Sequence, residues 1–462
     1  MITIVGGGIS GLATALAIDD LARNERMPPP ALQVLESTPR PGGKIRSEPE
    51  AEFLCEGGPN GFLDKEPKTF ELCKRLDLEV LPATDFFENR YLYRGGTLHQ
   101  VSMHPLQFMG SGLLPLSAKL RLAIEPFISA PNPFPEDESV ASFARRRIGE
   151  QAFRILIDAM QSGIYAGDPE RMSVVSCFRR VVEIEREYGS LIRGMVALMR
   201  KRKKGSPTPG AGPTGRLTSF PRGLQQLTDA MAQRLGDRLI TNTPVQGVSR
   251  GEGGEGYVVH AEGGRDFPSD LVILACPAFA GASILRGLDE ELTRLLRRID
   301  YAPMAVASIA WRREQVEHPL DGFGFLAPRR EGLRLLGALF TSSIFVQRAP
   351  KGHVLIRAML GGARDENILQ LDDEEILNAA RHDLAQVLGL RGQPVMHRIF
   401  RHEHAIPQYN VGHGRLLQSL DDRLEAHQGL LLTGNAFRGI GVNDCIVDAG
   451  LMAQRALKAL GV

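Results

Sequence analysis

Apolar runs, glycine clusters and helical patterns follow one another in the same order at both ends of the chain. Near the N-terminus, the apolar run Ile2–Val5 meets a glycine cluster, Gly6–Gly11, and a small-residue helical pattern follows. Near the C-terminus, an apolar run stops at Gly434, and further glycines precede a helical pattern from Ile446 to Met452. A strand, a tight turn and a helix leave backbone N–H groups free at the helix N-terminus, where an electron-rich ligand atom can bind. The pattern predicts one large ligand bound by both ends of the chain.

The N-terminal cluster has the G-x-G-x-x-G spacing, and a second apolar strand, Leu32–Leu35, ends at Glu36. In dinucleotide-binding units the first glycine permits the turn, the second admits a pyrophosphate and the third lets the helix pack on the strand, while the acid binds a ribose. Glu36 comes later than is usual, because Met27–Pro30 reads as a surface-loop insertion. The alternative is a sheet turn whose glycines serve packing alone. The predicted nucleotide-binding residues are Gly6, Gly7, Gly8, Ile9, Ser10, Gly11 and Glu36.

Two more glycine-containing turns follow, at Arg40–Arg46 and at Glu56–Gly61. A second glycine pair soon after the ribose-binding acid resembles the extension found in flavoproteins of the amine-oxidase type, so we expect FAD rather than NAD. At the other end of the ligand, N–H groups around Gly441 and Val442 would stabilise negative charge on a reduced flavin. The further predicted cofactor residues are Arg40, Gly43, Lys44, Gly58, Pro59, Asn60, Gly61, Val245, Gly434, Asn435, Ile440, Gly441 and Val442.

The same patterns predict an α/β protein with three parts. A Rossmann-type FAD-binding domain is expected to be discontinuous, formed by residues 1–86, 216–298 and 413–462. Residues 87–205 are expected to form a helical domain, and residues 299–412 a substrate-binding domain with a mixed sheet. Within the last, the strand-like runs are Ala305–Trp311, Leu335–Phe340 and Val354–Leu360, and Glu374–Leu388 is helical. Residues 201–215, basic and then rich in Pro and Gly, are expected to be a mobile surface loop.

One helical pattern in the second part has two interpretations. From Ser117 to Ile128, the apolar residues Leu120, Ile124 and Phe127 share one face at helical spacing. The favoured interpretation is the core of a helical subdomain. The alternative is an apolar patch that docks on a membrane to collect an apolar substrate.

Composition narrows the possible functions. The 462 residues carry a formal net charge of +1, which gives no support for nucleic-acid binding. The five cysteines are widely spaced, so we expect neither a disulfide framework nor a metal site. We therefore expect a reducing, cytoplasmic compartment. We expect no targeting peptide, because the first strand begins at Ile2. The longest apolar stretch, Leu271–Leu285, is too short to span a bilayer and contains Pro277.

Motifs along nearly the whole chain resemble those of the oxygen-dependent protoporphyrinogen oxidase family. The more specific ones are Tyr165–Pro169 and Gly441–Cys445. The others are Gly6–Leu12, Arg40–Gly43, Gly57–Asn60, Asn89–Tyr93, Ser162–Ile164, Gly322–Leu326, Thr341–Phe345, Arg348–Pro350, Ile406–Tyr409 and Gly434–Asn435.

The resemblance implies a function and several roles. A hydride would pass from a meso carbon of protoporphyrinogen IX to non-covalently bound FAD, which O2 would reoxidise to give H2O2 in haem biosynthesis. Arg90 would pair with a propionate, because a guanidinium binds a carboxylate in bidentate fashion. Leu326 and Phe345 would clamp a pyrrole ring, although core packing is their ordinary role. Gly163 and Gly167 would keep the backbone close to the macrocycle or the flavin.

The resemblance leaves several points open. No residue is assigned as a general acid or base. His402 stands where relatives often carry a tryptophan near the flavin, and its role is undefined. A homodimer, contact with the inner face of the cell membrane and hand-over of product to a chelatase remain open.

Three alternatives remain for the activity. The first is oxidation of coproporphyrinogen III, whose four propionates would require more basic groups in the pocket. The second is an amine oxidase or carotenoid desaturase, but no lysine lies between Lys204 and Lys351 to sit over the flavin, as it does in amine oxidases. The third is a flavin-free binding protein of the same fold, like the GDP-dissociation inhibitors.

Overall fold

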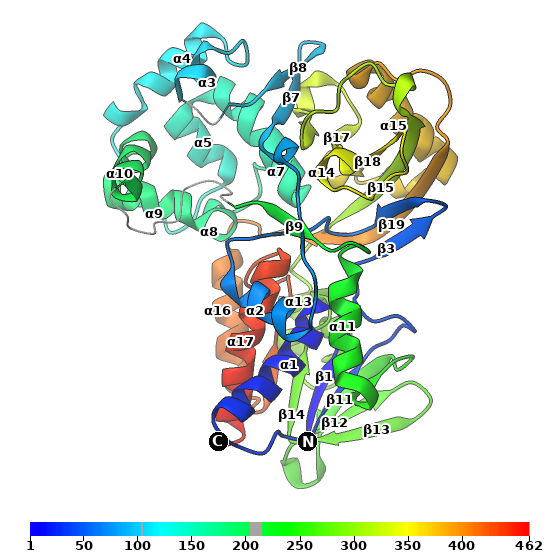
Figure 1. Ribbon diagram of the computed structural model, residues 1–462. Coiled ribbons are helices and arrows are strands. Elements are labelled where there is room, and N and C mark those ends of the chain that lie inside the picture. The colour runs from blue at the N-terminus through cyan, green and yellow to red at the C-terminus, as the bar shows by residue number, and fades with distance from the viewer. Residues whose placement is uncertain (103–104, 204–214, 462) are drawn as a thin grey trace.

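The computed structural model describes residues 1–102, 105–203 and 215–461, which form two lobes (Figure 1). The lower lobe contains both termini, and the upper lobe contains a helical region beside a large sheet (Figure 1). Within the described ranges, no helix is long and apolar enough to cross a membrane. In those ranges, groups of three or more potential metal ligands are also absent.

A five-stranded parallel sheet forms the centre of the lower lobe, in the order β10-β2-β1-β14-β20. Its strands come from all three segments assigned to the nucleotide-binding domain. They are β1 (Ile2–Val5), β2 (Leu32–Leu35), β10 (Leu239–Ile240), β14 (Leu271–Leu274) and β20 (Leu430–Leu432). The near-continuous apolar runs at β1 and β14 fit strands that are buried on both faces.

Helices cover one face of this sheet, and helices with a small sheet cover the other. On the first face lie α1 (Ile9–Asn24), α11 (Gln225–Leu235) and α17 (Val442–Ala459), which pack on Ile2, Ile4 and Ile273. The opposite face packs through Val5, Val272 and Leu274. The elements on that side are α12 (Ala278–Ile284), α13 (Glu290–Leu296), α16 (His413–Leu424), β11 (Val245–Arg250), β12 (Tyr257–Ala261) and β13 (Arg265–Ser269).

A seven-stranded mixed sheet forms one half of the upper lobe, in the order β19-β15-β18-β17-β16-β7-β8. All neighbours are antiparallel except β16 and β7. Its strands are β7 (Arg90–Arg94), β8 (Thr97–Gln100), β15 (Tyr301–Arg312), β16 (Gly324–Leu326), β17 (Leu335–Leu339), β18 (His353–Gly361) and β19 (Met396–Pro407). The predicted helix in this part is α15 (Asp373–Leu388), and it packs on the sheet through Ile376 and Ala380.

The helical region lies beside this sheet (Figure 1). Its helices are α3 (Pro105–Gly110), α4 (Leu116–Ala123), α5 (Val140–Ile148), α6 (Glu150–Ala152), α7 (Asp158–Tyr165), α8 (Val174–Cys177), α9 (Arg179–Tyr188) and α10 (Leu191–Lys203), with a π-helical turn at Phe153–Ile157. The remaining short elements are β3 (Ser47–Glu50), β4 (Phe53–Glu56), β5 (Phe62–Leu63), α2 (Pro67–Arg75), β6 (Leu81–Pro82), β9 (Leu217–Ser219) and α14 (Thr341–Ile344).

Three sequence predictions in this region were wrong in detail. Residues 87–205 are not wholly helical, because β7 and β8 belong to the large sheet through a distant pairing of Arg90 with Gly324. The helix expected from Ser117 to Ile128 ends at Ala123, and a 3₁₀ turn (η2, Glu125–Phe127) contains Pro126, which cannot donate to a helix. The loop expected at 201–215 starts later, since α10 continues to Lys203; residues 204–214 lie outside the described residues.

Candidate functional site

A cavity of about 660 Å³ lies where the two lobes meet. One wall comes from the carboxyl ends of β1, β2 and β14 and from the N-termini of α1 and α17, and the facing wall comes from α7, β15, β18 and β19. Its volume is typical of a small-molecule or cofactor site, and its position at the carboxyl edge of a parallel sheet is the usual one for such folds.

The three glycines of the N-terminal motif serve different purposes. Gly6 has φ +114°, and a Cβ there would lie 2.9 Å from the Ala275 carbonyl oxygen; a Cβ on Gly11 would lie 2.0 Å from the Gly6 oxygen. A Cβ on Gly8 would meet no protein atom within 4 Å, and Gly8 lines the cavity. The first and third glycines are therefore required by packing, whereas the second opens the backbone to a ligand at the N-terminus of α1.

Glu36 lines the cavity just after β2. Its carboxylate accepts a hydrogen bond from the Gly7 amide at 2.7 Å, and from the amide and hydroxyl of Thr38 at 2.9 and 2.7 Å. The Ser37 hydroxyl also donates to Oε1, at 3.3 Å, whereas among the described residues Oε2 accepts from the Gly7 amide alone. These bonds fix the orientation of the carboxylate and leave a position on Oε2 for a ribose hydroxyl, because each carboxylate oxygen has two lone pairs.

The N-terminus of α17 meets the opposite end of the cavity. Asp444 caps it, its carboxylate accepting from the Gly441 amide at 3.0 Å. The loop before the helix is held by the Tyr409 hydroxyl, which donates to the Asn435 carbonyl at 2.7 Å and accepts from the Gly439 amide at 2.9 Å. Both helix N-termini therefore meet one cavity, as the two glycine-rich turns predicted, but the Gly441 amide is taken by Asp444, so the N–H groups that α17 offers begin at Val442.

The turn at residues 57–61 carries unpaired polar groups. Asn60 is 7% exposed, and neither atom of its side-chain amide has a hydrogen-bond partner among the described residues. Pro59 and Gly61, on either side of it, line the cavity. A buried amide without partners costs about 1–3 kcal/mol, but Asn60 itself does not line the cavity, so the contribution of this turn to a cavity ligand is the backbone of Gly58, Pro59 and Gly61.

Three basic side chains line the cavity: Lys44, Arg357 and His402. Lys44 Nζ donates to the Ala405 carbonyl at 2.7 Å and lies 5.1 Å from the centre of the Tyr301 ring. Burial lowers the pKa of Lys44 to about 8 and the pKa of Arg357 to about 10. Two desolvated cations suit an anionic ligand.

Arg357 was not among the residues predicted from the sequence, although the sequence contains a signal for it. Arg357 is the single charged residue in the apolar run Val354–Leu360, which becomes β18. Side chains on one face of a strand recur every second residue, so Met359 lines the cavity with it, and Met304 and Val306 do so from β15. Met304, Val306 and Met359 form an apolar wall of the cavity. The sequence predicted the strands but not which of their faces turns toward the cavity.

The predicted substrate residues are not all brought together. Gly163 lines the cavity, and Leu326 lies behind it, since a Cβ on Gly163 would be 2.5 Å from Leu326 Cδ2. Gly167 is required by protein packing instead of by a ligand, because a Cβ there would lie 2.1 Å from Met172 Sδ. Phe345 is completely buried and does not line the cavity, which gives a clamping role no support.

Arg90 lies outside the cavity, on β7. Its guanidinium carbon is 5.1 Å from the centre of the Phe87 ring and 5.8 Å from that of Phe323. Burial lowers its pKa, and among the described residues its side chain has no hydrogen bond or ion pair. A half-buried cation of this kind is suited to an acidic ligand.

Most of the predicted cofactor residues do line the cavity. They are Gly6, Gly8, Ile9, Ser10, Glu36, Gly43, Lys44, Gly58, Pro59, Gly61, Val245, Gly434, Asn435, Ile440, Gly441 and Val442. Gly7, Gly11, Arg40 and Asn60 do not. Arg40 instead shapes the neighbouring turn, donating to the Ile45 and Gly43 carbonyls at 2.8 and 2.7 Å.

The parallel sheet, the two helix N-termini and the facing mixed sheet define a two-domain dinucleotide-binding flavoprotein. The chain belongs to the family of flavin-containing amine oxidoreductases, whose model matches residues 9–457. It is therefore an oxidoreductase that uses a flavin cofactor.

Named relatives extend over nearly the whole chain. The chain is 31% identical to coproporphyrinogen III oxidase of Bacillus subtilis, over 99% of this chain and 98% of that one. It is also 31% identical to chloroplastic protoporphyrinogen oxidase 1 of Arabidopsis thaliana, over 96% of this chain and 86% of the relative. A crystal structure from Exiguobacterium sp. 255-15, described as a candidate protoporphyrinogen oxidase, has a TM-score of 0.83 at 25% identity, covering 100% of this chain and 99% of that one.

Proposed function

We propose that this flavoenzyme oxidises a porphyrinogen, protoporphyrinogen IX, to the porphyrin with O2 as the final acceptor, releasing H2O2. The observation that carries the proposal is the cavity at the junction of the lobes. In it, the two glycine-rich turns of the nucleotide-binding domain face an apolar wall from the seven-stranded sheet. Relatives over nearly the full length of the chain are named for oxidation of porphyrinogens, which agrees with an apolar, ring-shaped substrate.

The cofactor in this proposal is non-covalent FAD, which accepts hydride when bound. The backbone at Gly8 and the start of α1 would hold the pyrophosphate, Glu36 the ribose, and the start of α17 the flavin. Lys44 would offset phosphate charge. Across the cavity, Met304, Val306 and Met359 would exclude water and orient the macrocycle.

The cations in the cavity, and Arg90 outside it on β7, support the dipropionate substrate over the tetrapropionate one. The cations Lys44 and Arg357 already donate to backbone carbonyls. Arg90 is a further cation, and its side chain has no acidic partner in the described ranges. So few uncommitted cations suit the two propionates of protoporphyrinogen IX better than the four of coproporphyrinogen III.

The proposal is tested by supplying purified, FAD-loaded protein with each porphyrinogen and measuring porphyrin fluorescence and peroxide together. We expect faster turnover of protoporphyrinogen IX, with peroxide formed in proportion. Equal or faster turnover of coproporphyrinogen III would overturn the substrate assignment. A protein that stays colourless with added FAD would overturn the flavoenzyme assignment.

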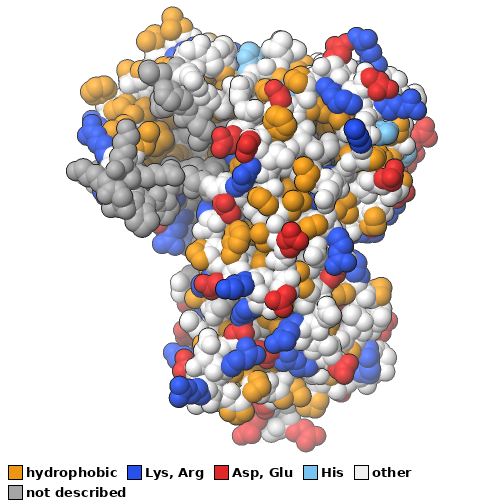
Figure 2. Space-filling model, in the orientation of Figure 1, with side chains coloured by type: hydrophobic (Ala, Val, Ile, Leu, Met, Phe, Trp, Pro, Cys, Tyr) orange, Lys and Arg blue, Asp and Glu red, His pale blue; other side chains and the backbone are white. Residues whose placement is uncertain are grey.

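We also propose that the helical region docks on the inner face of the cell membrane. α4 and η2 expose Leu120, Ile124 and Phe127, the last 81% exposed. Hydrophobic side chains gather over this part of the molecule in Figure 2. The neighbouring α10 exposes Met195 and Met199. This exposure favours the docking patch over the core interpretation for these side chains.

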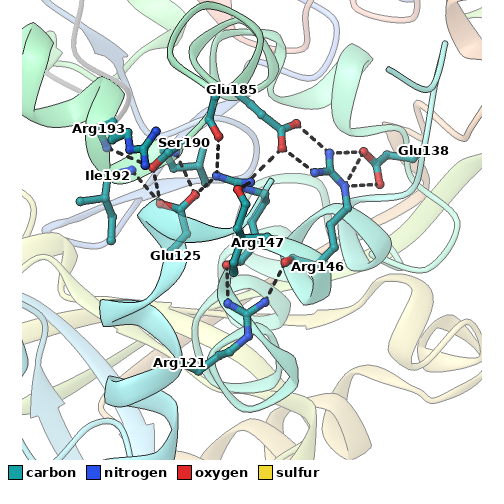
Figure 3. A network of polar contacts seen from close by, with 12 residues as sticks. Arg121, Glu125, Glu138, Arg146, Arg147, Glu185, Ser190, Ile192 and Arg193 are labelled. Carbon is teal, nitrogen blue, oxygen red and sulfur yellow. Dashed lines mark hydrogen bonds and ion pairs between the residues drawn. The ribbon is translucent and has the colours of Figure 1, made fainter. Parts of the chain in front are cut away.

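A buried ion network supports this patch from beneath (Figure 3). The Glu125 carboxylate pairs with Arg147, and it also accepts from the Ser190 hydroxyl and the amides of Leu191 and Ile192, where α10 begins. Both members of the ion pair are fully buried. Glu125 thus fixes the turn that contains Ile124 and Phe127 to α10, and this contact does not depend on a membrane.

Liposome flotation tests the docking proposal. We expect the wild-type protein to float with anionic vesicles and a Leu120→Ser/Phe127→Ser variant to stay in the soluble fraction. Leu451→Ser, at a 46% exposed position on α17, is the matched control and should float like wild type. Equal flotation of the double variant would contradict the proposal.

A further inference from the structure

His402 on β19 lines the cavity and is held through one ring nitrogen. Its Nε2 lies 2.8 Å from the Gly57 carbonyl oxygen. A carbonyl only accepts hydrogen bonds, so Nε2 carries the hydrogen. In the neutral ring Nδ1 then has a free lone pair. Nδ1 has no hydrogen-bond partner in the described part of the chain.

The contacts around Gly57 show that this orientation is built into the site. Arg357 Nε donates to the Glu56 carbonyl at 3.0 Å, and its Nη2 donates to the Gly58 carbonyl at 2.5 Å. Arg357 and His402, both on the seven-stranded sheet, therefore bind the backbone carbonyls of three successive residues. The Gly57 amide donates to the Arg46 carbonyl at 2.8 Å, which fixes the turn from its other side. The imidazole cannot turn over without breaking this arrangement.

The surroundings keep the ring neutral. Cations face it from two directions: Arg357 on β18, and Lys44 and Arg46 in the segment before β3. On its own strand, Arg401, Glu403 and His404 are exposed to solvent. Burial, reinforced by those cations, lowers the pKa of His402. At neutral pH the cavity thus contains a nitrogen base and no imidazolium.

We propose that His402 Nδ1 is the proton acceptor in each two-electron oxidation of the porphyrinogen. The assignment rests on the proposed function. In each cycle a ring C–H bond breaks and its hydride leaves to the flavin, and through it to O2. A proton also leaves the ring and bonds to Nδ1, from a pyrrole N–H in two cycles and from a second meso carbon in the remaining one, so that four C–H and two N–H bonds break in all. The electron pair that each proton leaves behind closes a new conjugated double bond. The imidazolium passes its proton to water, which returns one proton as O2 is reduced to H2O2.

His402→Gln separates this role from a purely structural one, because the Gln amide can still donate to the Gly57 carbonyl but carries no base. In anaerobic mixing of FAD-loaded protein with porphyrinogen, we expect flavin bleaching to slow by about 100-fold or more. The wild-type rate should fall as the pH is lowered, while the variant rate should stay flat. His404→Gln, two residues along the strand with its ring 4.2 Å from Phe279, is the control and should bleach like wild type.

A spectroscopic measurement is independent of turnover. In ¹⁵N-histidine-labelled protein, the signal lost in His402→Gln should be that of a neutral ring protonated at Nε2 at pH 7. An imidazolium, or the opposite tautomer, would overturn the assignment. So would a His402→Gln variant that bleaches within about threefold of wild type, or equal slowing in His404→Gln. Wild-type protein that oxidises no porphyrinogen would overturn the proposed function first, and this assignment with it.

Discussion

Lys44 should reduce the stability of the cofactor-free protein while it serves cofactor binding. Its pKa falls from 10.5 to about 8 because the ammonium is buried. At about 1.4 kcal/mol per pH unit, the charged form costs about 3 kcal/mol. Lys44→Met removes this cost and also the hydrogen bond to the Ala405 carbonyl, which offsets about 1 kcal/mol. The cofactor-free variant should therefore be more stable than wild type by about 2 kcal/mol at pH 7.

The pH dependence follows from the direction of the pKa change. Below pH 8 the folded and unfolded chains both carry the proton, so the cost is fully present. Between about pH 8 and 10.5 the unfolded chain binds more protons than the folded one, and wild-type stability rises with pH. The advantage of Lys44→Met should therefore disappear across this range.

Urea unfolding of the cofactor-free protein at pH 7 and pH 10 measures the difference in stability. Flavin fluorescence measures the affinity for FAD, which should be at least about tenfold lower in the variant. Lys119→Met is the matched control, since Lys119 Nζ also donates to a backbone carbonyl, that of Ser111, at 2.7 Å but outside the cavity. A variant that is less stable than wild type at pH 7, or an advantage that persists at pH 10, would refute the reasoning.

Three further predictions follow from the same contacts. Gly8→Ala should keep its unfolding free energy within about 0.5 kcal/mol but lose FAD affinity, whereas Gly11→Ala should lose at least about 2 kcal/mol of stability, because its Cβ would lie 2.0 Å from a carbonyl oxygen; equal stabilities would be inconsistent with this. Arg90→Ala should raise KM for porphyrinogen about tenfold or more with kcat nearly unchanged, and an unchanged KM would count against propionate binding. Glu125→Gln should cost about 1.5–3 kcal/mol in chemical unfolding, because the buried Arg147 loses its nearer carboxylate and keeps Glu185 at 3.4 Å; a cost below about 0.5 kcal/mol would show that the pair is not coupled to folding.

Local pattern was sufficient for the nucleotide-binding end. The strand Ile2–Val5, the glycine turn and the helix from Ile9 have strong signals within one short segment, and the same is true of Gly434 to α17. Each glycine requirement depends on nearby backbone or on one neighbouring strand. The sequence therefore predicted a helix after each turn and the flavin class with them, although α1 begins inside the glycine cluster, at Ile9, and α17 begins at Val442, before the apolar pattern from Ile446.

Long-range pairing limited the rest of the fold. Arg90–Leu92 looked like part of a helical region, but it pairs with Gly324–Leu326, more than 200 residues later in the chain. Nothing within its own segment signals that partner. The prediction that Phe345 lines the substrate site was not supported for the same reason. Phe345 packs instead against Ala83 and Phe87, which come from a distant part of the chain.

The sequence by itself determined the class of protein, because turn geometry and helix starts are encoded by adjacent residues. Only the tertiary structure decided which side chains share the substrate side of the cavity. Arg357 and His402 come from strands that both neighbour β15, and they reach the carbonyls of Glu56, Gly57 and Gly58, roughly 300 residues earlier. Strand register and sheet order create that meeting, and a one-residue slip would turn either side chain to the opposite face.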